Sequence, residues 1–417
     1  MANTCGVILA ALKSKKTQFP TPHECSITGY RELDAEHDVS KLLPEVDPDG
    51  LLEYSVVFTD RALNHMSKLF QQVMRDISAT LRQVYNADGV ALVPGGGTFA
   101  MEAVARQFAT GRKCLVIRNG WFSFRWSQIF EAGAISAEEI VLKARRISSE
   151  ESAPYAPPPI AEVVAAIQAE QPDLVFAPQV ETASGILLPD GYLRQMAEAV
   201  HAYGGMLVLD AIAAGTIWLD MKAVGVDVLI SAPQKGWSAS PSCGLVMLSE
   251  RALARIDDTQ STSFACDLRK WLHIMQAYEN GGHAYHATLP TDALKCLRDA
   301  MRDTEAFGFE RAREAQFELG RRVRDMLAAR GIASVAAPGF EAPGVVVSYT
   351  RDAGIHNSSR FAEQGLQTAA GVPLQCDEPP SFKTFRVGLF GLDKLGNIER
   401  TVAQLEQGLE RALAEIE

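Results

Sequence analysis

Cysteine is scarce in this chain. Seven cysteines are scattered among 417 residues, at positions 5, 25, 114, 243, 266, 296 and 376, and none belongs to a CxxC pair. This distribution argues against a disulfide framework and offers no metal-ligand spacing, so we expect a reducing compartment and no metal site. Apolar runs are short as well, since none approaches the roughly 18–20 residues of a transmembrane helix.

We expect no signal peptide, because the apolar run near the start has only six residues and precedes the basic cluster, whereas in a signal peptide the basic residues come first. Excess positive charge is absent too: 40 Lys and Arg face 51 Asp and Glu, for a net charge of −11. That balance disfavours a nucleic-acid partner. We therefore expect a soluble cytoplasmic protein of one very large domain or two ordinary ones, without a membrane or nucleic-acid partner.

The segment from Met206 to Trp237 is the most informative part of the chain. Two apolar, β-branched runs, Met206–Ile212 and Val226–Ala232, are typical of buried parallel strands. Polar residues stand where each run stops. Because ligands of open α/β sheets collect beyond the carboxyl ends of the strands, these side chains are expected in one crevice. They are Asp210, Ser231, Gln234 and Lys235.

An aspartate and a lysine in this arrangement suit pyridoxal 5′-phosphate. The lysine amine bonds to the cofactor aldehyde, and the carboxylate keeps the ring nitrogen protonated so that the ring can accept electrons. On these two residues alone, the alternative is an aspartate that caps a turn and a solvated lysine. The neighbouring residues favour the first interpretation, because Asp210-Ala211-Ile212 and the turn from Ser231 to Trp237 resemble two motifs of the class V aminotransferases, D-A-[VI] and S-x-x-Q-K-x-[LW]. The similarity is to the alanine–glyoxylate and serine–pyruvate aminotransferase group, and it implies Ile212 and Gln234 beside the cofactor.

A glycine turn precedes this segment. Val90–Val93 is a predicted strand, Pro94–Thr98 is a glycine-rich turn, and Phe99–Phe108 is a predicted helix. Strand, glycine turn and helix form a phosphate cradle, in which backbone amides and the helix dipole face the anion. The turn resembles the family's G-[SG]-G-T-x-A-[ML]-E, which implies that Gly96, Gly97 and Thr98 hold the cofactor phosphate. A P-loop is not expected, because no Walker lysine follows.

Four further motifs match the family in order. In N-G-x-[WF]-x-x-R-W the aromatic, Phe122, is implied to stack on the cofactor ring. In E-[ST]-x-[ST]-G the first hydroxyl residue, Thr182, is implied to lie beside the phenolic oxygen, although such a hydroxyl also suits a helix cap. In Y-H-x-T-x-P, Tyr285 and Thr288 are implied to reach the phosphate of the neighbouring subunit. In [FL]-R-[IV]-G, Arg386 is implied to bind the substrate α-carboxylate in a bidentate pair.

The resemblance implies an α/β fold of type I, with a mostly parallel seven-stranded sheet covered by helices on both faces and a smaller α+β C-terminal domain. We expect an arm at 1–50, a large cofactor-binding domain at 51–300 and a small domain at 301–417. A long helix from Pro290 to about Gly320 should join the two domains. One departure affects the substrate side: Phe58–His65 stands where the family carries a G-P-G-P-type segment.

The function implied is an aminotransferase that moves an amino group from a small amino acid to glyoxylate or pyruvate by a ping-pong mechanism. Lys235 and Asp210 are the expected catalytic residues, and a homodimer with shared active sites is the expected assembly. The alternatives are a 2-aminoethylphosphonate–pyruvate transaminase and a lyase of the cysteine desulfurase type, for which Cys376 is the candidate thiol. Asp377 and Glu378 disfavour a thiolate there. A pyridoxal-binding regulator would need a DNA-binding helix-turn-helix, which the first 50 residues do not resemble.

Overall fold

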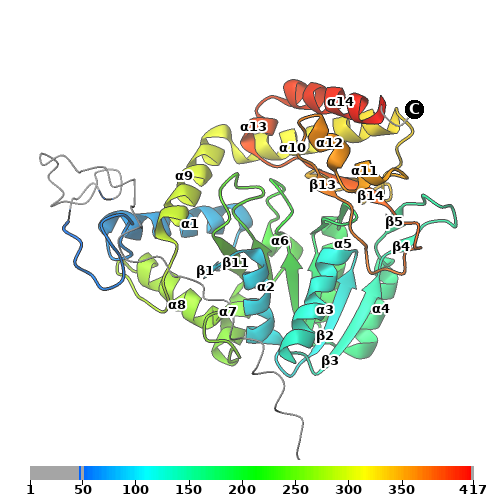
Figure 1. Cartoon of the computed structure of the whole chain (residues 1–417). Helices are drawn as coiled ribbons and strands as arrows, with labels where there is room; N and C mark the ends of the chain where they lie inside the picture. Colours follow the sequence, from blue (N-terminus) through cyan, green and yellow to red (C-terminus); the bar gives the residue numbers. More distant parts are fainter. Residues whose placement is uncertain (1–46, 48–50, 415–417) are drawn as a thin grey trace, which may run out of the picture.

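The computed structural model describes residue 47 and residues 51–414, so the predicted arm lies outside the described residues except for Asp47. A seven-stranded sheet forms the centre of the chain, and helices cover both of its faces (Figure 1). Every neighbouring pair is parallel except those that involve β11, which confirms the mostly parallel sheet. The strands lie in the order β1 (Gly89–Pro94), β11 (Cys243–Leu248), β10 (Val228–Ser231), β9 (Met206–Asp210), β6 (Leu174–Pro178), β2 (Lys113–Arg118) and β3 (Glu138–Lys143).

The strand ends decide where the polar side chains meet. Strand β9 is shorter than the run Met206–Ile212 suggests, because the Asp210 side chain accepts a hydrogen bond from the Ile212 N–H at 3.0 Å and turns the chain out of the sheet. The register pairs Asp210 with Ile230 on one side and Pro178 on the other. Asp210 therefore lies at the carboxyl edge of the sheet, between the ends of its two neighbours.

Helix α1 (Lys68–Tyr85) begins after Ser67, which caps it by accepting a hydrogen bond from the Phe70 N–H at 3.1 Å. The single helix predicted from Pro290 to about Gly320 is wrong. The chain forms α9 (Thr291–Phe307) and then α10 (Phe309–Ala328), broken at Gly308. Gly308 has φ 98°, a conformation that side chains with a Cβ rarely adopt.

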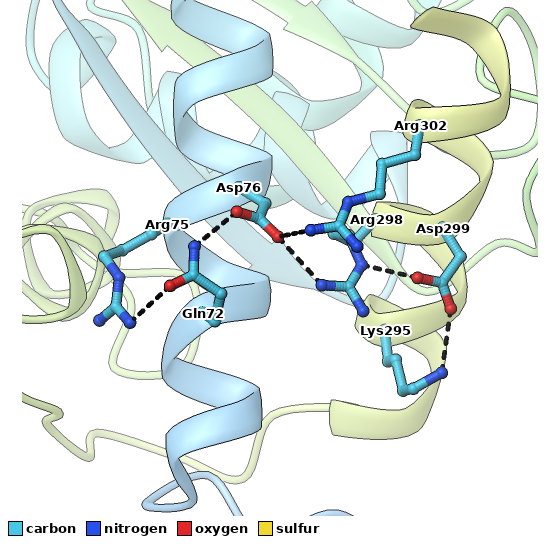
Figure 2. Close-up of polar contacts among 7 residues, drawn as sticks. All are labelled: Gln72, Arg75, Asp76, Lys295, Arg298, Asp299 and Arg302. Carbon is cyan, nitrogen blue, oxygen red and sulfur yellow. Dashed lines mark hydrogen bonds and ion pairs between the residues drawn. The ribbon is translucent and has the colours of Figure 1, made fainter. Parts of the chain in front are cut away.

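Figure 2 shows how α1 is joined to α9 by charged side chains. Asp76 on α1 forms ion pairs with Arg298 at 3.0 Å and with Arg302 at 2.7 Å. Arg298 also pairs with Asp299 at 2.6 Å. Only 7% of the Arg298 side chain is exposed. The buried guanidinium of Arg298 needs both carboxylates as partners, and its ion pair with Asp76 fixes α9 against α1. Helix α9 leads toward the C-terminal part of the chain.

The C-terminal part has its own three-stranded sheet, in the order β12 (Val345–Tyr349), β14 (Thr384–Gly388) and β13 (Ala369–Ala370). A second apolar core packs between this sheet, α10 and α14 (Ile398–Ala414). The boundary expected at residue 300 stays a prediction. Within the described residues, no helix is both long and apolar enough to cross a membrane.

The remaining elements complete the layers around the two sheets. They are α2 (Gly97–Val104) with a π-helical turn (Ala105–Ala109), α3 (Trp121–Gly133), β4 (Arg145–Arg146), β5 (Tyr155–Ala156), α4 (Ile160–Glu170), β7 (Val180–Glu181), β8 (Ile186–Leu187), α5 (Asp190–His201), α6 (Met221–Val224), α7 (Glu250–Asp257), α8 (Leu268–Glu279), α11 (Ala353–His356), α12 (Ser359–Glu363) and α13 (Leu392–Leu395).

Candidate active site

A cavity of about 480 Å³ opens at the carboxyl edge of the large sheet, against the edge of the small sheet. It brings together most of the residues that the sequence singles out, although they come from six separate motifs. Those that line it are Gly97, Thr98, Phe122, Thr182, Asp210, Ile212, Gln234, Lys235 and Arg386. Its other charged lining residue is Arg125.

Lys235 follows β10 in a turn whose backbone is tightly held. A Cβ on Gly236 would lie 2.1 Å from the Gly215 carbonyl oxygen, so only glycine allows these two loops to touch. The Lys235 Nζ lies 5.2 Å from the centroid of the Phe390 ring. Burial lowers the pKa of Lys235, and Arg386 lowers it further, while Asp210 opposes both. A lysine in this setting carries a neutral amine at lower pH than a solvated one.

Asp210 is the one carboxylate among the residues that line this cavity. It is 6% exposed, and burial raises its pKa to about 7, with nearby Glu181 adding to the rise. The Ile212 N–H, Arg125 and Lys235 act in the opposite direction. A carboxylate buried at this point without an ion pair in the described chain is suited to a cationic partner that enters the cavity.

The start of α2 offers open backbone amides. Its N-cap residue, Gly96, has no side chain to cap the helix, and a Cβ built on Gly96 would meet nothing within 4 Å. A Cβ on Gly97 would instead lie 2.5 Å from Ile212 Cδ1, so the glycine lets the cradle approach the strand-end loop. The first N–H groups of a helix have no intrahelical acceptor, and they attract an anion. Gly96 itself is not among the residues that line the cavity.

Phe122 and Arg386 both line the cavity and lie close to each other. The Arg386 Cζ is 5.5 Å from the centroid of the Phe122 ring, and its Nε donates to the Ala370 carbonyl at 2.8 Å. That bond anchors the guanidinium of Arg386, which lines the cavity, to β13. Thr182 lines the same cavity beyond β7.

Sequence reasoning missed several residues that shape this site. Glu181 is fully buried and caps α3, because its carboxylate accepts from the backbone N–H groups of Phe122 and Ser123 at 3.1 and 2.8 Å. Glu181 and Arg125 are fixed positions of the E-[ST]-x-[ST]-G and N-G-x-[WF]-x-x-R-W motifs, and this could have identified them from the sequence. No motif pointed to the small-domain lining, which is Gln367, Thr368, Ala369 and Phe390.

Tyr285 and Thr288 do not line this cavity within their own chain. The Tyr285 hydroxyl lies 3.0 Å from the Thr288 hydroxyl, and 53% of Tyr285 is exposed. The Tyr285 ring packs against His65, at 5.5 Å between ring centroids. Phe58 also packs against His65, with 5.5 Å between the ring centroids, so the segment that departs from the family pattern contacts the support of the tyrosine and does not line the Lys235 cavity.

Cys376 lies in a different cavity, beside the 143–149 segment. Its thiol is buried and lies 3.2 Å from the Arg118 carbonyl oxygen. Burial raises the pKa of this thiol to about 12, and Glu181 and Glu378 add to the rise. A protonated thiol outside the Lys235 cavity is unsuited to attack a substrate there.

The family model described as aminotransferase class-V matches residues 51–370, more than half of the chain. The chain belongs to the class V aminotransferase family. It is therefore an enzyme that transaminates, and class V aminotransferases depend on pyridoxal 5′-phosphate.

Individual members of the class V family resemble the chain over most of its length. The alanine–glyoxylate aminotransferase of Rattus norvegicus is 26% identical over 393 residues, covering 89% of this chain and 86% of the rat protein. A 2-aminoethylphosphonate–pyruvate transaminase of Paraburkholderia xenovorans is 27% identical over 358 residues, covering 84% and 90%. The crystal structure of an alanine–glyoxylate aminotransferase from Nostoc sp. shares the fold, with a TM-score of 0.70, 22% identity and coverage of 84% and 88%.

Proposed function

We propose that this class V aminotransferase binds pyridoxal 5′-phosphate in the Lys235 cavity and moves an amino group from a small amino acid to glyoxylate or pyruvate. The observation that carries the proposal is the convergence of Lys235, Asp210 and Phe122 on one cavity. An amine, a buried acid and a flat ring are the groups that this cofactor requires from its protein.

The residues of the cavity fit the cofactor. The uncapped amides at Gly97 and Thr98 suit the phosphate, Phe122 suits the ring face, and Thr182 and Gln234 suit the polar ring edge. Ile212 adds an apolar wall. The buried Asp210 would then face the ring nitrogen, where a cation relieves the cost of its burial.

When bound, the cofactor supplies a conjugated ring that accepts the electrons of the substrate α C–H bond. Lys235 would hold the cofactor in the resting enzyme. Once the donor amine takes its place, the free Lys235 amine would be placed to remove the proton from the donor α carbon and to return it on the other side of the amine nitrogen, which is a 1,3-proton shift. Its lowered pKa favours the neutral amine needed for this general-base step.

Arg386 would bind the donor carboxylate by two parallel N–H···O bonds and so aim the α C–H bond at Lys235. The bond from its Nε to Ala370 fixes the guanidinium before the substrate arrives. Phe390 and Ala369 line the small-domain side of the cavity, where the donor side chain would lie. The amino group would stay in the cavity until a 2-oxo acid collects it, which is ping-pong kinetics.

The 2-aminoethylphosphonate–pyruvate reaction is the second candidate, favoured by the 27% identical relative that bears this name. Its donor has a phosphonate and no carboxylate, so Arg386 would face the phosphonate instead. A desulfurase-type lyase is not proposed, because the Cys376 thiol is buried outside the cavity and its pKa is raised.

We further propose a cytoplasmic homodimer with shared sites. Tyr285 and Thr288 carry a bonded pair of hydroxyls on a surface that also exposes large apolar groups. Exposed apolar patches on soluble proteins mark contact sites, and a second copy would bring the two hydroxyls to the phosphate cradle. Phe264 is 79% exposed and packs on His286, the residue after Tyr285, and the described chain also exposes Leu51, Leu52, Tyr54, Val56 and Met66.

A half-reaction tests the proposed function without an assumed product. The cofactor-loaded enzyme is mixed with each of a panel of small amino acids and with 2-aminoethylphosphonate, and the absorbance of the aldehyde form is followed. The true donor should convert this absorbance to that of the amine form, and glyoxylate or pyruvate should then restore it. Failure of every amine to convert the wild-type enzyme would contradict the proposal.

A further inference from the structure

Three cations line the Lys235 cavity against a single carboxylate. The cations are Lys235, Arg386 and Arg125, and the carboxylate is Asp210. Lys235 is required for the cofactor bond and Arg386 for the substrate, as proposed above. Arg125 has no such assignment. Within residue 47 and residues 51–414, no carboxylate lies within ion-pair distance of it.

The position of Arg125 connects it to the glycine cradle. It lies on the second turn of α3, and its Nη1 donates to the Thr98 hydroxyl at 3.0 Å. Its Cζ is 5.2 Å from the centroid of the Phe122 ring. The guanidinium therefore stands between the start of α2 and the ring on which the cofactor would stack.

The bond between Arg125 and Thr98 also orients the hydroxyl. Because Oγ1 of Thr98 accepts the Arg125 N–H, the proton of that hydroxyl is free to point toward a third group. Arg125 keeps four further N–H donors, in a planar fork that matches two oxygens of a phosphate. The cradle has glycines and one hydroxyl, and it lacks the lysine of a P-loop.

We infer that Arg125 is a binding residue for the cofactor phosphate, and that it acts together with the Thr98 hydroxyl and the uncapped amides of α2. The inference rests on the proposed function, since it concerns the cofactor of that site. It accounts for the charges of the cavity: Arg125 neutralises the phosphate and Arg386 the substrate carboxylate. A guanidinium selects for the phosphorylated cofactor over the same ring without phosphate.

The test compares two ligands that differ only in the phosphate. The cofactor-free wild type, Arg125→Gln and Arg125→Lys are each titrated with pyridoxal 5′-phosphate and with pyridoxal, and binding is followed by quenching of tryptophan fluorescence. Arg146→Gln is the matched control, because Arg146 is exposed and lies outside this cavity. Circular dichroism of each variant verifies that it is folded.

We expect Arg125→Gln to weaken binding of pyridoxal 5′-phosphate by roughly 10- to 100-fold, the effect of losing a charge-assisted hydrogen bond, and to leave pyridoxal binding within about threefold. The affinity of Arg125→Lys for pyridoxal 5′-phosphate should lie between those of wild type and Arg125→Gln, and the affinity of Arg146→Gln should match that of wild type. Inorganic phosphate should compete with pyridoxal 5′-phosphate for binding to the wild type, and this competition should be lost in Arg125→Gln.

Two results would overturn the inference while the proposed function stands. One is equal loss of affinity for both ligands, which would mean that Arg125 supports Phe122 or the fold. The other is unchanged cofactor affinity with a raised KM only for donors that carry a second acid group, which would assign Arg125 to the substrate. Failure of the wild type to bind the cofactor would instead contradict the proposed function itself.

Discussion

The carboxylate of Glu181 accepts two hydrogen bonds from Ser123, one from its backbone N–H at 2.8 Å and one from its hydroxyl at 2.6 Å. A third bond from the Phe122 N–H, at 3.1 Å, fixes the residue expected to stack on the cofactor. Both Glu181 and Ser123 are fully buried. A buried carboxylate at the N-terminus of α3 thus satisfies amides that the helix leaves without partners and sets the position of the aromatic ring.

Glu181→Ala should lower the free energy of unfolding by about 2–4 kcal/mol, because several buried donors lose a charged acceptor. Urea unfolding of the cofactor-free protein measures this change. The exposed Glu314 on α10 provides the control Glu314→Ala, which should shift stability by less than about 0.5 kcal/mol. Equal stability of the two variants would show that Glu181 does not hold α3 in the way the contacts suggest.

Asp210 makes the stability of the cofactor-free protein depend on pH. Its pKa is about 7 in the folded chain, against 3.8 for the free side chain. The folded state therefore keeps a proton that the unfolded state releases, and the free energy of unfolding falls as the pH rises from about 4 to about 7. Asp210→Asn should remove this dependence and be more stable than wild type at about pH 8, by roughly 2–4 kcal/mol.

Urea unfolding of both proteins at about pH 5 and about pH 8 measures the difference in slope. The exposed Asp303 supplies the control Asp303→Asn, which should keep the wild-type slope. Loaded with cofactor, Asp210→Asn should retain it but lose most turnover, because an amide gives the ring nitrogen no ionic partner. Parallel pH profiles for wild type and Asp210→Asn would contradict the assigned environment of this carboxyl.

Cys376→Ala should leave transamination within a fewfold of wild type, because the thiol is buried and its pKa is raised to about 12. In the native protein Cys376 should also resist alkylation, whereas the exposed Cys296 should react. Mass spectrometry of alkylated peptides distinguishes the two. Loss of turnover in Cys376→Ala, together with loss of sulfide release from cysteine, would favour a lyase instead.

The proposed dimer predicts complementation between two inactive subunits. One carries Lys235→Ala, and the other carries Tyr285→Phe with Thr288→Val. If the two hydroxyls serve the phosphate of the partner's site, a mixed dimer has one site with every group intact and should recover part of the activity. Subunit exchange is verified by native mass spectrometry, and mixed dimers that form but stay inactive would rule out the shared site.

The sheet and its ligand edge could be predicted from the sequence, because β9 and β10 are short apolar runs that end in polar residues. Lys235 and Asp210 follow directly from those ends. The break at Gly308 was missed, since the apolar pattern on both sides is helical and continues across the glycine. The positive φ of Gly308, which separates α9 from α10, is seen only in the structure.

The small-domain side of the site could not be predicted for a different reason. Phe390 lies near Lys235 and Thr368 lines the same cavity because the two domains pack together, and no local sequence pattern records that packing. Arg125 stood in a quoted motif, but its bond to Thr98 depends on how α3 lies against α2. Tyr285 illustrates a further limit, because its predicted partner belongs to another subunit.

The attachment of the cofactor tests the central claim most directly. The wild-type protein, loaded with pyridoxal 5′-phosphate, is reduced with borohydride, digested and mapped by mass spectrometry. Lys235→Ala is the matched variant, and Lys222 on α6, which forms an ion pair with Asp88 at 2.6 Å, is the nearest lysine earlier in the chain. We expect a single adduct on Lys235 that is absent from the variant, whereas an adduct on Lys222 or any other lysine would contradict the assignment of Lys235 as the cofactor lysine.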